Sequence, residues 1–142
     1  HVKSKIYTFE VERPSEYIAK ALDISTEDFV YRIVRVRLVE GVSQVIEYTY
    51  MPISLVPNLK MAHLEHSIYN YIESEIGLKI ANAHRVNRAV MPTEVEASRL
   101  EISTGDPLLE VEQIGYIDDG RAFEYSISRH AHGYEFMTIS MH

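Results

Sequence analysis

A fifteen-residue stretch occurs twice in this 142-residue chain, with an offset of 78 positions. PSEYIAKALDISTED at positions 14–28 and PTEVEASRLEISTGD at positions 92–106 share eight identical residues. Each copy continues with an apolar run, an acidic-glycine turn, and a Glu-Tyr pair followed by Thr or Ser. Self-similarity at a fixed period indicates that one structural unit is used twice. We therefore expect a fold with an internal two-fold repeat.

The residues within the repeat carry the signals of a short helix followed by a corner. Ser15 and Thr93 are good helix N-caps, and each precedes a glutamate in the first turn, where the helix dipole favours negative charge. Helices are expected at about 16–22 and 93–100. The sextets DISTED and EISTGD then supply Ser, Thr and Asp, which favour turns over helix interiors. Each sextet is predicted to be the corner that leads from a short helix into a long hairpin.

The apolar runs after the two corners predict β-hairpins. They cover about 29–51 and 107–130, with turns at Glu40-Gly41 and at the DDG of 118–120.

Other elements are expected between and after the hairpins. IYNYIESEI carries its apolar residues on a helical stripe, with Ser67 at the N-cap position and Gly77 as the stop. LKIANAHRVNRAV is typical of a strand, and YEFMTISM of a closing strand. This mixture predicts an α+β domain with a mainly antiparallel sheet flanked by helices.

Length and composition restrict the protein class. A hydrophobic content of 46% in 142 residues suffices for one core, so residues 1–142 are expected to form a single domain. A net charge of −7 argues against direct binding to a nucleic-acid backbone. The absence of cysteine removes disulfides, thiol catalysis and Cys-based zinc sites, and it favours a cytoplasmic location. No apolar run is long enough for a membrane helix, so no membrane partner is expected.

The first repeat carries an arginine pair that the second lacks. Strand alternation places Val34, Val36 and Leu38 on one face of the first hairpin, and Arg35 and Arg37 on the other. At the repeat offset, glutamine and glycine replace the two arginines, so the fold itself does not require arginine there. Two guanidinium groups roughly 7 Å apart can converge on one phosphate or carboxylate. The alternative is a solvated edge with two ordinary salt bridges.

Four further residues have both a structural and a ligand-binding interpretation. Ser67 is a helix N-cap, but a helix start with a free hydroxyl can also bind an anion, and Tyr69 could add its phenol. Glu47 and Glu124 occur in both repeats amid apolar residues. Such carboxylates either pair with arginines or hydrogen-bond ligand hydroxyls.

Other sites are not expected. His63 and His66 have helical ligand spacing without an evident third ligand, so a surface pair is favoured over a metal site. The sequence contains no glycine-rich phosphate loop, nucleophile elbow or zinc signature. We expect no catalytic residues, no metal and no cofactor.

Four motifs, in order and with matching spacing, identify a resemblance: IAKALDISTEDFVYRIVRVRLVEG, IEYTYMPISLVPNL, SIYNYIESEIGL, and GRAFEYSISRH followed by YEF. The chain resembles the UTRA domain, the effector-binding half of HutC-type transcriptional repressors of the GntR family. The resemblance implies a chorismate-lyase-like fold, a cytoplasmic homodimer and a small-molecule effector. It also implies that operator DNA is bound only through an N-terminal winged helix-turn-helix head, which this chain, starting at His1, lacks.

The resemblance also implies a pocket for a sugar phosphate. In sugar-responsive members, residues matching Arg35, Arg37, Ser67 and Tyr69 bind the phosphate, and carboxylates matching Glu47 and Glu124 bind sugar hydroxyls. His130 stands where an aromatic residue often covers the sugar ring. The motif HAHGY at 130–134 departs from the family's frequent Arg-Gly-Asp-Arg-Tyr, so the phosphate end is better defined than the sugar end.

Two alternatives of other classes stay open. One is a chorismate-lyase-like enzyme acting on an anionic small molecule, because the arginine pair could bind a substrate carboxylate equally well. The other is a dimerisation module with a vestigial pocket. The sequence names neither the effector nor the operator.

Overall fold

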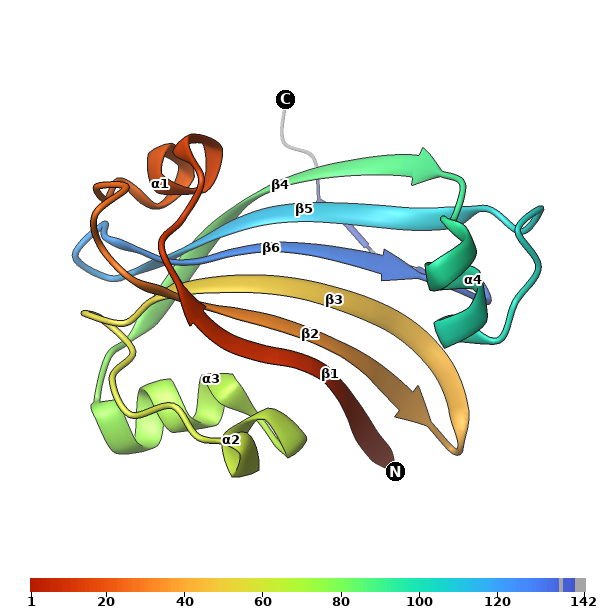
Figure 1. Cartoon of the computed structure of the whole chain (residues 1–142), viewed down its shortest axis with the longest axis horizontal. Helices are drawn as coiled ribbons and strands as arrows, with labels where there is room; N and C mark the ends of the chain where they lie inside the picture. Colours follow the sequence, from red (N-terminus) through yellow and green to blue (C-terminus); the bar gives the residue numbers. More distant parts are fainter. Residues whose placement is uncertain (136, 140–142) are drawn as a thin grey trace.

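The computed structural model describes residues 1–135 and 137–139, and a six-stranded antiparallel sheet forms its centre (Figure 1). The strands lie in the order β1-β2-β3-β6-β5-β4. Their bounds are β1 (Val2–Glu12), β2 (Val30–Val39), β3 (Val42–Pro52), β4 (Ile80–Val90), β5 (Leu108–Ile117) and β6 (Ala122–His130). The helical elements are α1 (Glu16–Leu22), α2 (Met61–Glu65), α3 (Ile68–Asn70), the π-helix η1 (Tyr71–Ile76) and α4 (Glu94–Leu100). The prediction of an α+β fold with an antiparallel sheet is confirmed.

Both predicted hairpins form, and each turn contains a glycine with a left-handed backbone. Glu40 and Gly41 have φ of 51° and 79°, and they connect β2 to β3 next to the Val39–Val42 pair. A two-residue turn with positive φ at both positions matches the right-handed twist of the strands. In the second hairpin, Gly120 has φ of 89°.

Each sextet of the repeat forms the predicted corner. The helices end at Asp23 and Glu101, both with a left-handed backbone, at φ of 53° and 57°. In each sextet the serine N–H then donates to the carboxylate of the final aspartate, at 2.9 Å in the first copy and 3.1 Å in the second. The two corners therefore have the same local structure, while the internal two-fold repeat of the whole fold stays a prediction.

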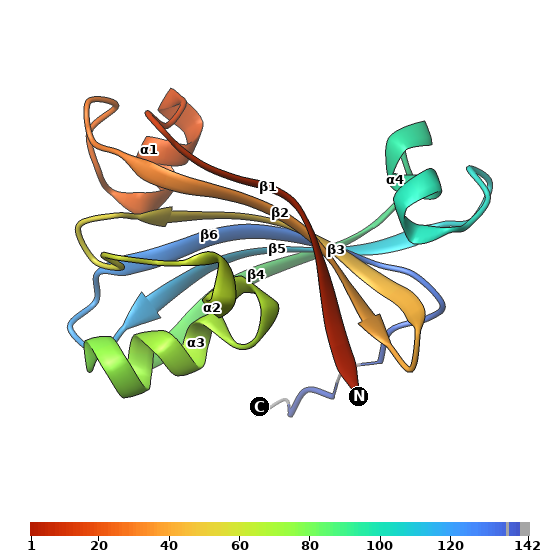
Figure 2. The same ribbon diagram turned by 60° about the horizontal axis from the view of Figure 1, so that its bottom comes forward.

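The helices cover opposite faces of the sheet (Figure 2). On the face covered by α1 and α4, Val34 and Val36 of β2 are buried in a cluster that includes Leu100 of α4. On the other side, Ile33 packs in a cluster with Leu64, at the end of α2, and with residues of α3 and η1. As predicted, alternation along β2 places Arg35 and Arg37 on the face opposite Val34 and Val36, and the structure shows that α2 and α3 cover this face.

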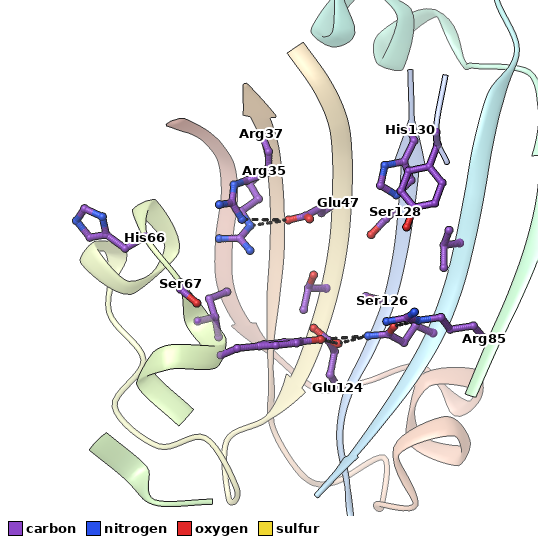
Figure 3. Close-up of a pocket in the computed structure, with 16 residues that line it drawn as sticks. Arg35, Arg37, Glu47, His66, Ser67, Arg85, Glu124, Ser126, Ser128 and His130 are labelled. Carbon is purple, nitrogen blue, oxygen red and sulfur yellow. Dashed lines mark hydrogen bonds and ion pairs between the residues drawn. The ribbon is translucent and has the colours of Figure 1, made fainter. Parts of the chain in front are cut away.

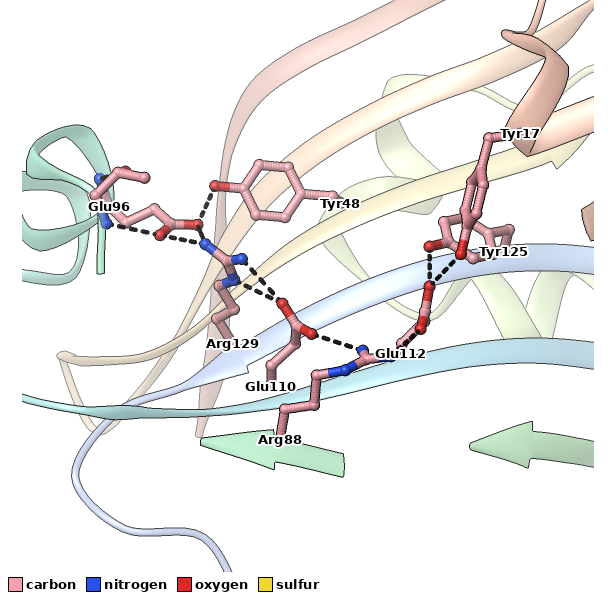
Figure 4. A network of polar contacts seen from close by, with 9 residues as sticks. Tyr17, Tyr48, Arg88, Glu96, Glu110, Glu112, Tyr125 and Arg129 are labelled. Atoms are coloured by element: carbon pink, nitrogen blue, oxygen red, sulfur yellow. Dashed lines mark hydrogen bonds and ion pairs between the residues drawn. The ribbon is translucent and has the colours of Figure 1, made fainter. Parts of the chain in front are cut away.

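A polar network fills the sheet face between α1 and α4 (Figure 4). Arg129 binds Glu96 of α4 at 2.7 Å and Glu110 of β5 at 2.9 Å, and Glu110 also meets Arg88 at 2.9 Å. Tyr48 donates to Glu96 at 2.6 Å. Burial of Glu96 opposes its ionisation, but these hydrogen bonds and that from the Thr93 N–H outweigh it and lower its pKa. These charges satisfy one another and leave the opposite face as the candidate for ligand binding.

The helix predicted over IYNYIESEI is only partly an α-helix. Residues 68–70 form α3, but residues 71–76 form the π-helix η1, in which the N–H of Gly77 donates to the carbonyl of Ile72 five residues earlier. Ile68, Tyr71 and Ile72 of the predicted stripe are buried. Over so few residues an apolar stripe suits either helix type, so the pattern could not separate them.

The predicted closing strand is wrong within the described residues. YEFMTISM spans 134–141, and residues 134, 135 and 137–139 are not in a strand, while the rest of the segment lies outside the described residues. Ala131, by contrast, is buried and its N–H donates to the carbonyl of Gln44, so the chain after β6 is first tied to the start of β3. Strand β1 and helix α2 are not among the predicted elements.

Candidate functional site

Strand alternation gathers polar side chains on the sheet face beneath α3. On β6, Glu124, Ser126, Ser128 and His130 share this face, since every second residue of a strand points the same way. They line a cavity of about 320 Å³ between the sheet and the start of α3 (Figure 3). Its volume is at the lower end of the range for small-molecule sites. All seven residues predicted to bind the effector line it: Arg35, Arg37, Glu47, Ser67, Tyr69, Glu124 and His130.

Arg35 is engaged in contacts within the protein. Its Nε donates to Glu47 at 2.8 Å, and one of its terminal nitrogens donates to the carbonyl of Leu64 at 2.7 Å. The side chain is 9% exposed. Because Leu64 lies near the end of α2, this guanidinium connects the sheet to the helix that precedes Ser67. Arg35 therefore stabilises the wall of the cavity, in contrast to the equal role predicted for the two arginines.

Arg37 lies on the same face but has a different environment. Its closest carboxylate is Glu47, 4.0 Å away, and its Nε is buried without a hydrogen-bond partner among the described residues. Burial and the positive charge of Arg35 lower its pKa, and Glu47 opposes this only in part. A partly desolvated guanidinium that lines a cavity and has only one long ion pair is suited to an anionic ligand.

The second repeat supplies the opposite side of the cavity with a neutral donor. Gln113, at the repeat position of Arg35, donates to Glu124 at 2.8 Å, and Tyr69 donates to the same oxygen at 2.5 Å. Burial raises the pKa of Glu124, although these two hydrogen bonds work against the rise. In each repeat, a side chain on the first hairpin strand thus donates to a carboxylate on the second strand. The donor is the guanidinium of Arg35 for Glu47 and the amide of Gln113 for Glu124.

Gly115, at the repeat position of Arg37, is needed for close packing. A Cβ added at Gly115 would lie 2.8 Å from the ring of Phe123 and 3.5 Å from Glu124. Any side chain there would displace the buried phenyl ring beside Glu124. The absence of a second arginine pair therefore has a steric reason.

The segment entering α3 supplies one wall of the cavity. Ser67 is the N-cap, and its hydroxyl accepts from the N–H of Asn70 at 3.1 Å. His66 lies beside it at the Arg37 end, as Figure 3 shows. Tyr69, which the resemblance places at the phosphate end with Ser67, instead binds Glu124 in this structure. For Tyr69 to bind a phosphate together with Ser67, its phenol would have to rotate away from that carboxylate.

His130 and Tyr134 form an aromatic rim. Their ring centroids lie 4.0 Å apart, and both residues line the cavity. Burial lowers the pKa of His130, with Glu47 opposing the change, so the neutral imidazole is favoured. A neutral ring beside hydroxyl-bearing side chains provides an apolar surface for a sugar ring to stack on.

Several residues that line the cavity were not predicted from the sequence. Thr49, His66, Arg85, Gln113, Ser126 and Ser128 also line the cavity. Alternation from Glu124 along β6 would have found the two serines, and the repeat offset from Arg35 leads directly to Gln113. No local pattern indicates Arg85, because only the sheet order brings β4 to this site.

The predicted histidine pair separates in the structure. His63 stacks on Tyr71 with ring centroids 3.8 Å apart, and its Nδ1 accepts from the N–H of Lys60. His66 instead borders the cavity. Residues 1–135 and 137–139 contain no cluster of three His, Cys, Asp or Glu that could hold a metal ion. Nor is any helix in that part of the chain long and apolar enough to cross a lipid bilayer.

Comparison with known sequences connects this site to a family. Residues 1–134 match the UTRA domain family. The chain is 45% identical over 131 residues to the HTH-type transcriptional regulator GmuR of Bacillus subtilis, covering 92% of this chain and 55% of that protein. It is 35% identical over 123 residues to the mannosyl-D-glycerate transport/metabolism system repressor MngR of Escherichia coli, covering 87% of this chain and 51% of that protein. The chain thus spans about half the length of these curated relatives.

Solved structures agree with these sequence matches. A GntR-family transcriptional regulator from Bacillus cereus superposes with a TM-score of 0.85 and 38% identity, covering 99% of both chains. The regulator YydK from Bacillus subtilis gives a TM-score of 0.92 and 28% identity over 99% of this chain and 63% of that one. These relatives and neighbours are transcriptional regulators and not enzymes, which supports a regulatory role over a catalytic one.

Proposed function

Because the chain belongs to the UTRA domain family, we propose that it is the effector-sensing domain of a bacterial transcriptional repressor. Its effector is a small phosphorylated sugar, bound in the cavity between the sheet and α3. Effector binding controls the attachment to operator DNA of a winged-helix head linked to this domain. The working unit is a cytoplasmic homodimer, and binding shifts it between two arrangements of the heads. Such a shift requires that the effector favour one arrangement over the other.

The observation that carries this proposal is the environment of Arg37. The chain has a net charge of −7, yet this guanidinium lines a cavity with a buried Nε that no described residue satisfies. Leaving a buried donor unpaired costs about 1–3 kcal/mol, and a phosphate oxygen would remove that cost if the guanidinium turned its Nε towards the cavity. A phosphate group would also relieve the repulsion between Arg37 and Arg35. Ser67 and His66 lie at the same end and provide further polar contacts.

The remaining lining residues suit sugar hydroxyls. Glu47 and Glu124 are hydrogen-bond acceptors, whereas Ser126 and Ser128 can both donate and accept. His130 provides the stacking surface described above. The name of the relative MngR supports a sugar-derived effector, because it refers to mannosyl-D-glycerate.

A binding assay with paired ligands tests the proposal. Thermal unfolding is followed with sugar phosphates and with their unphosphorylated parents, since a ligand that binds only the folded state raises the melting temperature. A phosphorylated sugar is expected to stabilise the domain more than its parent does. Arg37→Gln should weaken this binding by about 2 kcal/mol, or about thirty-fold.

A matched control lies on the same strand. Arg32 is on β2 but pairs with Glu10 at 3.4 Å, and it does not line the cavity. Arg32→Gln should leave the affinity for the sugar phosphate unchanged. Equal affinity in wild type and Arg37→Gln, or equal stabilisation by phosphorylated and unphosphorylated sugars, would remove the phosphate from the site.

A further inference from the structure

A second arginine enters the cavity from the side opposite Arg37. Arg85 projects from the edge strand β4, whereas Arg37 projects from β2, and both line the same cavity (Figure 3). Four strand spacings separate β2 from β4 in the sheet order, which is roughly 19 Å between backbones. The two side chains therefore enter the cavity from opposite halves of the sheet, and each can serve a different group of one ligand. The two arginines therefore define two separate polar ends of one cavity.

Arg85 is distinguished by the partner it lacks. Every other arginine among the described residues either lies within 4.0 Å of a carboxylate or, like Arg99, stacks over an aromatic ring. Among the described residues, Arg85 has neither a carboxylate within 4.0 Å nor an aromatic ring beneath its guanidinium. It is held only by the neutral side chain of Gln113, whose amide oxygen accepts from its Nε at 2.5 Å. In a chain with a net charge of −7, this cation is not neutralised by its own protein.

Gln113 directs the guanidinium into the cavity. Arg85 and Gln113 are paired across β4 and β5, and the amide nitrogen of Gln113 donates to Glu124 and to Tyr69, at 2.8 and 3.1 Å. The glutamine amide is therefore bound at both ends and cannot rotate without breaking these contacts. With its Nε occupied, Arg85 retains its two terminal nitrogens, which can donate side by side to the two oxygens of a carboxylate.

Glu124 is the acid that faces this end, and it does not neutralise Arg85. One oxygen of Glu124 already accepts from Tyr69 and Gln113. Burial favours its protonated form by raising its pKa, which reduces its repulsion of an incoming anion. At the other end, Glu47 lies 2.8 Å from Arg35 and 4.0 Å from Arg37, so one carboxylate serves two arginines and an excess of positive charge remains there.

We propose that Arg85 binds a carboxylate of the effector, so that the effector is a phosphorylated sugar acid. This inference rests on the proposed function. Arg37 takes the phosphate, the serine-lined floor takes the hydroxyls between, and Arg85 selects for the acid group. Arg85 is thus a specificity-determining residue.

Two commercially available compounds separate the two ends. Glucose 6-phosphate and 6-phosphogluconate share the phosphate, but only the second carries a carboxylate at the far end. Affinities are measured by calorimetry for the wild type, Arg85→Gln and the control Arg121→Gln, whose arginine pairs with Asp119 outside the cavity. The wild type is expected to prefer 6-phosphogluconate by about tenfold or more, the value of one charged hydrogen-bonded pair.

Arg85→Gln should remove this preference while changing the affinity for glucose 6-phosphate less than about threefold, and Arg121→Gln should retain the preference. Arg85 is exposed at the rim of the cavity, so Arg85→Gln is expected to fold normally. The melting temperature of this variant without ligand checks that it does. A wild type without preference, or a preference that survives in Arg85→Gln, overturns the carboxylate assignment. Failure of the proposed function looks different: neither compound would then bind more tightly than gluconate or glucose, and Arg37→Gln would have no effect.

Discussion

Replacing Arg35 and Arg37 separately with glutamine should have opposite consequences for stability and for ligand binding. Arg35 makes two charged hydrogen bonds, to Glu47 at 2.8 Å and to the Leu64 carbonyl at 2.7 Å. Removing one partner of a buried ion pair typically costs about 3–5 kcal/mol, because the other charge is left unpaired. Glu47 remains 22% exposed and keeps Arg37 at 4.0 Å, so we expect the lower end, about 3 kcal/mol.

That loss should be visible in thermal unfolding. For a domain of this size, about 3 kcal/mol corresponds to a fall in melting temperature of roughly 10 °C. Arg37→Gln, in contrast, removes a long contact and a buried donor without a partner, so its melting temperature should stay within about 3 °C of the wild type. Arg37→Gln should therefore be the more stable of the two variants and yet be impaired in ligand binding.

The double variant Arg35→Gln/Glu47→Gln shows whether the unpaired carboxylate of Glu47 causes the loss of stability in Arg35→Gln. It removes the unpaired carboxylate, so it should be less destabilised than the sum of the two single variants. Circular dichroism during heating and urea titration measure these differences. Equal melting temperatures for Arg35→Gln and Arg37→Gln would refute the division of roles derived from the hydrogen bonds.

Two further substitutions test the environment of Glu124. Its pKa is raised by burial, so its contribution to stability is fully present below its unfolded pKa and is lost as the pH rises through the folded value. Glu124→Gln should therefore melt higher than the wild type at about pH 8, with the difference shrinking towards about pH 5, and a pH-independent difference would contradict this. Gly115→Ala should destabilise the domain by about 1–3 kcal/mol, because its Cβ would lie 2.8 Å from the Phe123 ring; unchanged urea unfolding would show that the ring can move freely.

Much of the site follows from the sequence, because strand alternation and helix caps are local properties. The period of two along β2 assigns Arg35 and Arg37 to one face, and the same period along β6 assigns Glu124 and His130 to one face. The internal repeat locates both carboxylates on second hairpin strands. It also shows that the first copy's arginines are not demanded by the fold.

The sequence by itself therefore determined the hairpins, the corners and the side of each strand on which a polar residue lies. Only the tertiary structure decided how these residues combine, since the order of strands and the face that a helix covers depend on burial between distant segments. The carbonyl of Leu64 approaches Arg35 across 29 positions, and this contact distinguishes Arg35 from Arg37. Arg85 reaches the cavity because β4 is placed at the edge next to β5. No periodicity within a single strand encodes either contact.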